Sequence, residues 1–299
     1  MVVVIGAGVT GLASALALAS RGRAVTVLER MPRPGLGAST RNSGVIHAGL
    51  YHPADSLKTR LCVEGRERLY AFAEANGVPH VRCGKLIVAQ AGEEARLETV
   101  ARTAAANGVT VEPVDRAFVS KREPHVSAAR ALWSPSTGWI DADAYIRALA
   151  AELARHDGVL LVGTPLAGIE SRGAGLTVVT PAERIDAELV VNAAGLYADE
   201  VSAMAGGEPF RIYPCRGEYA ELVPRSRGMV NGLVYPVPHP SGHGLGVHLT
   251  KTIGGAVWLG PTIHYQDDKA DYERDRLPLE SFFDSARLML PSLKLEDLR

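Results

Sequence analysis

The chain has little cysteine, no excess of charge of either sign and no long apolar run. Three cysteines occur in 299 residues, at Cys62, Cys83 and Cys215, and none belongs to a CxxC pair. This spacing argues against disulfides and against a zinc site, so we predict no metal and three small buried or half-buried thiols. The net charge of −1 comes without a basic stretch, which argues against nucleic acid as a partner.

No apolar stretch is long enough to cross a bilayer, so no transmembrane segment is expected. The longest stretch runs from Val9 through Ser20 and contains Thr10 and Ser14. Because a strand pattern begins at position 2, no leader peptide is expected either. We predict a cytoplasmic protein, with peripheral attachment to a membrane as an alternative. The apolar share of 46% and the charged share of 22% are typical of a globular chain with room for two domains.

The N-terminal residues predict a βαβ unit that binds a dinucleotide. An apolar strand runs into Gly6-Ala7-Gly8-Val9-Thr10-Gly11, and an Ala/Leu helix and a second strand follow. Gly6 permits the tight turn, Gly8 lets backbone amides approach a pyrophosphate, and Gly11 lets the helix pack closely on the sheet. Glu29 ends the second strand, where a carboxylate accepts from ribose hydroxyls and repels a 2′-phosphate. The expected ligand is an adenine dinucleotide, and a βαβ unit without a ligand is the alternative.

The rest of the chain alternates helices with short strands and then changes to strands. Ser56 is the predicted N-cap of a helix that buries Leu57, Leu61, Leu69 and Phe72 and ends at Asn76-Gly77. The other predicted elements are a strand at 85–89, helices at 93–107 and 142–156, short strands near Leu160 and Ile169, a buried strand at 187–191, a helix beyond Tyr197, and strands at 217–223, 229–237, 244–250 and 256–260.

A polar loop over 37–49 suits a long ligand that crosses the edge of a domain. With Leu28-Glu29-Arg30 and the later turn Asn192-Ala193-Ala194-Gly195, the glycine turn resembles the FAD-binding signature of the D-amino-acid oxidase-like flavoproteins. The resemblance implies FAD as the cofactor. The residues that it implies as FAD ligands are Gly6, Gly8, Val9, Thr10, Gly11, Glu29, Arg30, Ser39, Thr40, Arg41, Asn42, Ser43, Gly44, Ala194 and Gly195.

Longer motifs resemble a narrower group, the L-2-hydroxyglutarate dehydrogenases and oxidases. The motifs are Asn42 to Tyr51, Ser56-Leu57-Lys58, Cys83 to Ala89, Arg216 to Tyr219, Tyr235 to Pro238, Leu245 to Thr250 and Leu259-Gly260-Pro261. The resemblance implies oxidation of a small 2-hydroxy acid, L-2-hydroxyglutarate, to 2-oxoglutarate by hydride transfer to flavin N5. It leaves open whether oxygen, a quinone or a carrier protein accepts the electrons.

Members of this group usually continue beyond the position of Arg299, into a strand and a helix that complete the FAD domain. We therefore predict a discontinuous FAD-binding domain at 1–78 and 138–208, without its closing segment, and a substrate-binding domain at 79–137 and 209–299. The expected fold class is α/β. A Rossmann-like parallel sheet with helices forms the first domain, and an α+β domain on a mostly antiparallel sheet forms the second.

His248 and His47 are the candidate catalytic residues. Alternation along the predicted strand places Gly246, His248 and Thr250 on one face, where the histidine either lines a cavity or makes a structural hydrogen bond. His47 follows the polar loop, where a histidine can orient the flavin, attach to it or act as the base. We favour His248 as the base.

Arg216 is the candidate for binding a substrate carboxylate, because its guanidinium offers a bidentate fork. Tyr219 and Tyr235 are expected to bind a second carboxylate or the oxidised oxygen, and Thr250 joins this substrate-binding set. A solvated arginine is the alternative for Arg216. Asp199 and Glu200 are expected to favour the first turn of the helix beyond Tyr197, and the charged run at 267–274 is expected to be a solvated loop.

Two other functions stay open at this point. One is an amine oxidase of the same superfamily that acts on glycine or a D-amino acid. The other is a truncated FAD-binding protein without catalysis, or an electron-transfer subunit. Reduction of the flavin by a hydroxy acid, by an amino acid or by neither distinguishes the three.

Overall fold

The computed structural model describes residues 1–173, 175–238 and 246–299, so the predicted strand residues Gly244 and Leu245 lie outside the described part. The chain divides into two compact units, each described here by itself. Unit 1 comprises Met1–Asn42, Ala142–Pro214 and Gln266–Ala270, and unit 2 comprises Ser43–Asp141, Cys215–Tyr265 and Asp271–Arg299. Residues 43–78, which we predicted with the FAD-binding domain, pack in unit 2. The division into functional domains stays a prediction.

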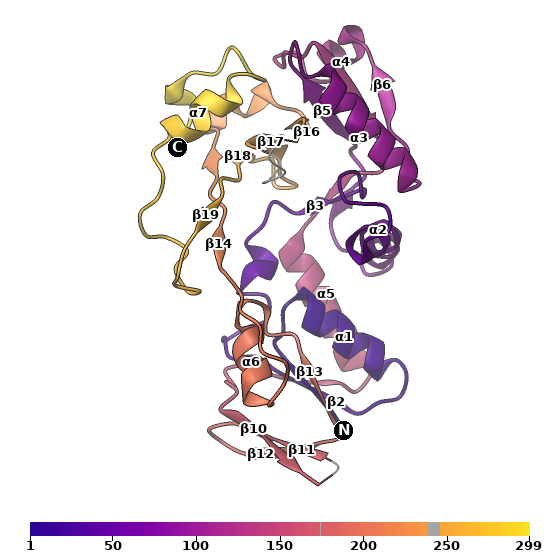
Figure 1. The fold of residues 1–299 in the computed structure, drawn as a ribbon, viewed down its shortest axis with the longest axis vertical. Helices are drawn as coiled ribbons and strands as arrows, with labels where there is room; N and C mark the ends of the chain where they lie inside the picture. The colour runs from indigo at the N-terminus through magenta and orange to yellow at the C-terminus, as the bar shows by residue number, and fades with distance from the viewer. Residues whose placement is uncertain (174, 239–245) are drawn as a thin grey trace. The chain divides into compact units, whose positions relative to one another are not determined.

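Unit 1 is built on a four-stranded parallel sheet in the order β13-β1-β2-β9. The strands are β1 (Val2–Ile5), β2 (Val25–Leu28), β9 (Val159–Leu161) and β13 (Leu189–Asn192). Neighbouring parallel strands require a crossover, and the apolar helix α1 (Val9–Ala19) provides it between β1 and β2. Helix α5 (Ala142–Arg155) packs beside α1 (Figure 1). The predicted βαβ unit is confirmed.

A second layer of unit 1 packs on this sheet. It contains an antiparallel sheet of β10 (Gly168–Arg172), β11 (Gly175–Val179) and β12 (Arg184–Ala187), together with the short helix α6 (Ala198–Met204). Val3 and Ile5 of β1 form one apolar cluster with Val178. The prediction of a buried strand near 187–191 is wrong for β13, because this strand has a neighbour on one side only in the described chain and Leu189 is 46% exposed.

Unit 2 is built on a seven-stranded sheet in the order β15-β18-β17-β16-β5-β7-β6. All neighbours are antiparallel except β16 and β5, which confirms the expected mostly antiparallel sheet. The strands are β5 (Lys85–Ala89), β6 (Glu112–Val114), β7 (Arg130–Ser134), β15 (Ala220–Glu221), β16 (Leu233–Pro236), β17 (His248–Lys251) and β18 (Val257–Gly260). The strand predicted over 217–223 is therefore limited to Ala220–Glu221.

Helices and small sheets complete unit 2. They are β3 (Val45–Ile46), α2 (Leu57–Ala75), β4 (His80–Val81), α3 (Glu94–Ala106), α4 (Arg116–Arg122), β8 (Gly138–Ile140), β14 (Cys215–Arg216), β19 (His264–Tyr265) and α7 (Glu280–Ala286); short 3-10 turns lie at Ala38–Thr40 and Gly195–Tyr197 in unit 1 and at Pro224–Met229 and Leu295–Asp297 in unit 2. The Ser56 side chain caps α2 by accepting from the Thr59 amide, as predicted.

The predicted buried side of α2 is partly wrong. Leu57 is 59% exposed and Leu61 is 54% exposed, and the helix instead buries Thr59, Tyr70 and Ala73. Helical spacing identifies residues that share a face, but it does not say whether another element covers the first turns.

The two faces of the seven-stranded sheet differ in chemistry. Leu86 and Val88 of β5 point to one face, where they join an apolar cluster with residues of α4 and α7. Ile87 and Ala89 point to the opposite face, where α3 covers them. Lys85 lies on this second face because side chains alternate along a strand. The second face is therefore apolar along one part of β5 and polar at Lys85.

Candidate functional site

The glycine turn of unit 1 has the close approaches that a dinucleotide-binding turn requires. Gly6 adopts φ +103°, and a Cβ there would lie 2.5 Å from the Ala193 carbonyl oxygen. A Cβ on Gly11 would overlap the Gly6 carbonyl oxygen, so α1 begins directly against the strand end. The two turns that sequence spacing marked are therefore adjacent, and the Ala193 amide donates to the Ile5 carbonyl at 2.9 Å.

Glu29 lies at the end of β2 beside this turn. Its carboxylate accepts from the Ala7 amide at 2.8 Å and from the Met31 amide at 2.9 Å, which fixes both oxygens. Each carboxylate oxygen keeps a second lone pair, so the group can still accept from a ribose hydroxyl. The turn and the carboxylate fit an adenosine diphosphate group.

The start of α1 supplies the complementary positive end. The N-cap residue of this helix is Gly8, which has no side chain to cap it, and the first turn contains no acidic residue. The Val9 amide donates to Ser39 Oγ at 2.9 Å, and the next amides of the first turn, before that of Leu12, have no acceptor within the helix. This arrangement suits a pyrophosphate.

The other predicted FAD ligands lie in both units. In unit 1, Arg30 stacks on the Tyr197 ring with its guanidinium carbon 3.8 Å from the centroid, and Thr40 donates to the Gly35 carbonyl at 2.7 Å. Asn42 donates to the Ser39 carbonyl at 2.8 Å. Ser43 and Gly44 belong to unit 2. Direct contact of these residues with FAD stays a prediction.

A polar cluster occupies the second face of the sheet in unit 2. Lys85 of β5 places its ammonium 4.3 Å from the ring centroid of Tyr235 and 4.8 Å from that of Tyr51. The Tyr235 ring stacks on the imidazole of His248 across the β16 and β17 pairing. Thr250 follows on the same face, because it lies two positions further along β17. The structure thus brings together three of the predicted site residues with Lys85.

Several polar atoms of this cluster are buried without a partner. Lys85 Nζ, Tyr51 OH and His248 Nδ1 have almost no accessible surface and no hydrogen-bond partner among the described residues. A polar group that is buried in this way loses its hydration without compensation, which costs free energy. Such atoms need a partner, and a bound ligand can supply it.

Burial controls the protonation of these groups. Desolvation lowers the pKa of Lys85 to about 7. Desolvation and then the Lys85 charge lower the pKa of His248 to about 3, against the raising effect of the Gly246 backbone, so its imidazole is neutral at pH 7. Dense surroundings and Lys85 also lower the pKa of His47, although the residue is exposed to solvent. Burial raises the pKa of Tyr51 and of Tyr235, so both phenols stay protonated.

Tyr219 lies at the margin of this cluster. The centroid of its ring lies 5.7 Å from that of the Trp258 ring, with the planes inclined by 49°. Burial raises the pKa of Tyr219, and a hydrogen bond with Ser43 offsets only part of that increase. It also acts electrostatically on Tyr235. Two predicted substrate ligands, Tyr219 and Tyr235, therefore lie close together.

Arg216 is already neutralised by acidic neighbours. Its guanidinium donates to Glu218 at 2.9 Å and lies 3.8 Å from Asp271, and the side chains of Arg216 and Glu218 are 8% and 6% exposed. The predicted alternative of a solvated arginine is wrong. A carboxylate ligand would have to compete with Glu218 for the same fork, so a substrate role for Arg216 stays a prediction.

Sequence reasoning missed Lys85 as a site residue. It lies in the motif Cys83 to Ala89, which was interpreted only as a predicted strand and as part of the family resemblance. The available signal was a lysine at the start of an otherwise apolar strand, since lysines are rarely fully buried without a partner.

Two further expectations need correction. Cys215 is exposed, not buried. The run at 267–274 is not only a solvated loop, because Lys269 contacts Asp199 at 2.6 Å and Glu200 at 2.8 Å, and Asp271 faces Arg216. The expected positions of Asp199 and Glu200 in the first turn of α6 are confirmed.

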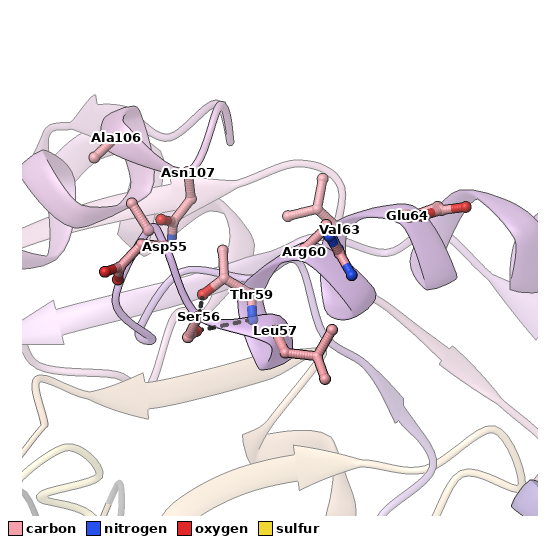
Figure 2. A pocket seen from close by; sticks show the side chains of 10 residues that line it. Asp55, Ser56, Leu57, Thr59, Arg60, Val63, Glu64, Ala106 and Asn107 are labelled. Carbon is pink, nitrogen blue, oxygen red and sulfur yellow. Dashed lines mark hydrogen bonds between the residues drawn. The ribbon is translucent and has the colours of Figure 1, made fainter.

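A separate pocket of about 660 Å³ opens beside the start of α2 (Figure 2). It is lined by Ala54, Asp55, Ser56, Leu57, Thr59, Arg60, Val63, Glu64, Ala106 and Asn107. Ser56 turns toward Thr59 and already caps the helix there, as the dashed lines in Figure 2 show. None of the predicted site residues lines it, and we assign it no ligand.

Within the described ranges, no helix is long and apolar enough to span a membrane.

Comparison with known proteins assigns the class. The profile of the DAO family, described as FAD dependent oxidoreductase, matches residues 1–299. The chain therefore belongs to the DAO family of FAD-dependent oxidoreductases, as the resemblance of its glycine turn indicated.

Curated relatives of this chain include L-2-hydroxyglutarate dehydrogenases. The human mitochondrial protein is 36% identical over 277 residues, which cover 87% of this chain and 60% of the relative. The protein of Salmonella houtenae is 35% identical over 264 residues, covering 87% of this chain and 63% of the relative. The chain thus spans about 60% of the length of these relatives.

Solved structures share the fold. L-alpha-glycerophosphate oxidase from Mycoplasma pneumoniae with FAD bound has a TM-score of 0.89 at 24% identity, covering 100% of this chain and 80% of that one. Glycine oxidase from Geobacillus kaustophilus has a TM-score of 0.80 at 23% identity, covering 100% and 79%.

Proposed function

We propose that this chain provides the FAD-binding fold and the substrate face of an enzyme that oxidises L-2-hydroxyglutarate to 2-oxoglutarate. The observation that carries the proposal is the set of buried, unpartnered polar atoms on one sheet face, Lys85 Nζ, Tyr51 OH and His248 Nδ1. A hydroxy dicarboxylate has the carboxylate and hydroxyl oxygens to pair with these atoms. The names of relatives at 36% and 35% identity support this choice over an amine.

The proposed roles follow from protonation and geometry. When bound, FAD accepts a hydride from the carbon that bears the hydroxyl group. We assign the hydroxyl proton to His248, because its imidazole is neutral at pH 7 and its Nδ1 has no partner in the described chain. The stacked Tyr235 ring holds the imidazole plane. His47 is the second candidate for the base, or a residue that orients or attaches the flavin.

An anaerobic titration of the flavoprotein tests this function. L-2-hydroxyglutarate is expected to bleach the flavin absorbance band, with D-2-hydroxyglutarate, glycine and D-alanine as matched alternatives. L-lactate lacks the distal carboxylate of L-2-hydroxyglutarate. If the site pairs that carboxylate, its absence costs about 2 kcal/mol or more, which predicts at least a ~30-fold lower kcat/KM for L-lactate. Bleaching by glycine or D-alanine alone would instead identify an amine oxidase, and no bleaching by any of them a non-catalytic FAD-binding protein.

The electron acceptor belongs to the same proposal. We propose oxygen, a quinone or a carrier protein, and reoxidation of the reduced flavin by oxygen and by a soluble quinone distinguishes the first two. The cellular location stays a prediction from the sequence.

A further inference from the structure

We infer that Lys85 is the cation that binds a carboxylate of the substrate and thereby determines specificity for anionic substrates. This inference deepens the proposed function and rests on it. Neither the sequence motifs nor the names of the relatives assign a role to this lysine.

The first support is burial without an ionic partner. Lys85 is 0% exposed, and Nζ has no hydrogen-bond acceptor among the described residues. Its neighbours are the faces of two aromatic rings, at 4.3 Å and 4.8 Å. A ring face attracts a cation, but it accepts no ordinary hydrogen bond from the three N–H groups of an ammonium. The ammonium therefore has donors to spare.

The second support is the set of groups around the ammonium. Tyr235 faces it from β16, Tyr51 from the segment after β3, and Cys62 from α2. The electrostatic effect of Lys85 also reaches His47 and His248. At neutral pH the phenols stay protonated, His248 is neutral, and burial raises the pKa of Cys62 above its usual value. No carboxylate is among these neighbours, so an incoming anion meets no competing negative charge from the residues described around Lys85.

Arg216 provides the contrast. Its guanidinium is paired with Glu218 at 2.9 Å and faces Asp271. Of these two buried cations, Lys85 is the one that lacks an acidic partner in the described chain. An arriving carboxylate can therefore pair with Lys85 without breaking an existing ion pair.

Binding at Lys85 also couples substrate recognition to the proton acceptor. The Lys85 charge is one cause of the low pKa of His248. A carboxylate beside Lys85 offsets that charge, which raises the proton affinity of the imidazole only when substrate is present. A general base is more effective when its pKa lies near the pH at which the enzyme works.

The experiment uses glutarate, a dicarboxylate that has no hydroxyl group to oxidise. Glutarate binding to the flavoprotein is measured by calorimetry at pH 6.5 for the unmodified chain, for Lys85→Met and for Lys121→Met, whose lysine is exposed on α4. We expect at least tenfold weaker binding in Lys85→Met and no change in Lys121→Met. In the unmodified chain alone, binding near pH 7 to 8 should take up protons, seen as a heat that depends on the buffer.

Thermal unfolding without ligand separates this role from a structural one. Because Lys85 has a lower pKa when folded, its burial penalty is complete below pH 7 and diminishes as the pH rises toward 10.5. Lys85→Met should therefore raise Tm by several degrees at pH 6 and by less at pH 9. A lowered Tm at both pH values, or glutarate binding within twofold of the unmodified chain, would overturn the inference.

The two proposals fail separately. If glutarate binding depends on Lys85 but no hydroxy acid bleaches the flavin, the proposed oxidation is wrong and the carboxylate site stands. If L-2-hydroxyglutarate bleaches the flavin with the same apparent Kd in Lys85→Met, the oxidation stands and the role of Lys85 is wrong.

Discussion

The ring of Tyr235 stacks on the imidazole of His248, with centroids 3.8 Å apart and ring planes inclined by 13°. The same Tyr235 ring lies 4.3 Å from Lys85 Nζ. One aromatic side chain therefore contacts both the proposed base and the proposed carboxylate-binding cation. Stacking fixes the plane of the imidazole while Nδ1 stays without a protein partner in the described ranges. A base held in this way needs little reorientation before proton transfer.

We expect His248→Ala to lower the limiting rate of flavin reduction by about 100- to 10,000-fold with little change in the apparent substrate Kd, because a general base acts mainly in the chemical step. Anaerobic rapid mixing with L-2-hydroxyglutarate measures both quantities. His125→Ala, at an exposed histidine next to α4, is the matched control and should reduce at the parent rate. If His47→Ala is slow while His248→Ala is not, His47 is the base.

The pH dependence of kcat/KM should show a plateau between about pH 5 and pH 7, since the carboxylates of the substrate are protonated at about pH 4. His248 is neutral above its pKa of about 3, and Lys85 is protonated below its pKa of about 7. Because the carboxylate requires the protonated lysine, kcat/KM should fall about tenfold per pH unit above pH 7, toward a lower limit set by binding to neutral Lys85. Lys85→Arg should retain the plateau to higher pH, since a guanidinium stays charged. A profile of Lys85→Arg that falls at the same pH would assign the basic limb to another group.

Local spacing predicted the dinucleotide turn and the cap of α2 well. Gly6, Gly11 and Glu29 act through contacts with the next strand or turn, and Ser56 caps a helix that starts one residue later. The contact of Gly6 with Ala193 joins two turns that are far apart in the chain, whereas the contacts of Gly11, Glu29 and Ser56 are short in sequence or belong to one βαβ unit. Their geometry follows from the motif itself.

The errors and omissions concern contacts between segments far apart in sequence. Arg216 is such a case only in part: Asp271, 3.8 Å away, is remote in the chain, but Glu218, which accepts from Arg216 at 2.9 Å, lies two residues later. Lys85 was interpreted as a strand residue without a site role, because its two ring partners come from other segments of the chain. For Leu57 and Leu61, periodicity indicated an apolar side but not that the side would remain uncovered. Register and partner identity in such cases depend on the assembled sheet.

We expect Arg216→Met to destabilise the protein by about 3 to 5 kcal/mol, because it leaves the buried Glu218 carboxylate without its cation. Urea unfolding measures the loss, and unfolding of the double variant Arg216→Met/Glu218→Met should recover most of it. If Arg216 is instead a dedicated substrate ligand, Arg216→Met should keep its stability and weaken glutarate binding. The two measurements therefore separate an internal ion pair from the carboxylate fork that sequence reasoning predicted.

Gly8→Val should leave the purified chain nearly free of FAD, because a side chain at the start of α1 occupies the place where backbone amides meet a pyrophosphate. The ratio of flavin to protein absorbance measures occupancy, and circular dichroism checks that the variant is folded. Gly65→Val is the matched control, since an added Cβ there meets nothing within 4 Å and flavin content should stay normal.

A second variant excludes a purely local clash at this turn. The added Cβ of Gly8 would lie 2.9 Å from Ser39 Oγ, which also accepts from the Val9 amide. If that contact alone expelled the cofactor, Gly8→Val/Ser39→Ala would recover flavin. Because Ser39 is itself a predicted FAD ligand, Ser39→Ala alone is the control, and we expect the double variant to retain much less flavin than Ser39→Ala because the valine side chain stays against the pyrophosphate. Normal flavin content in Gly8→Val itself would contradict the assignment of this turn as the FAD site.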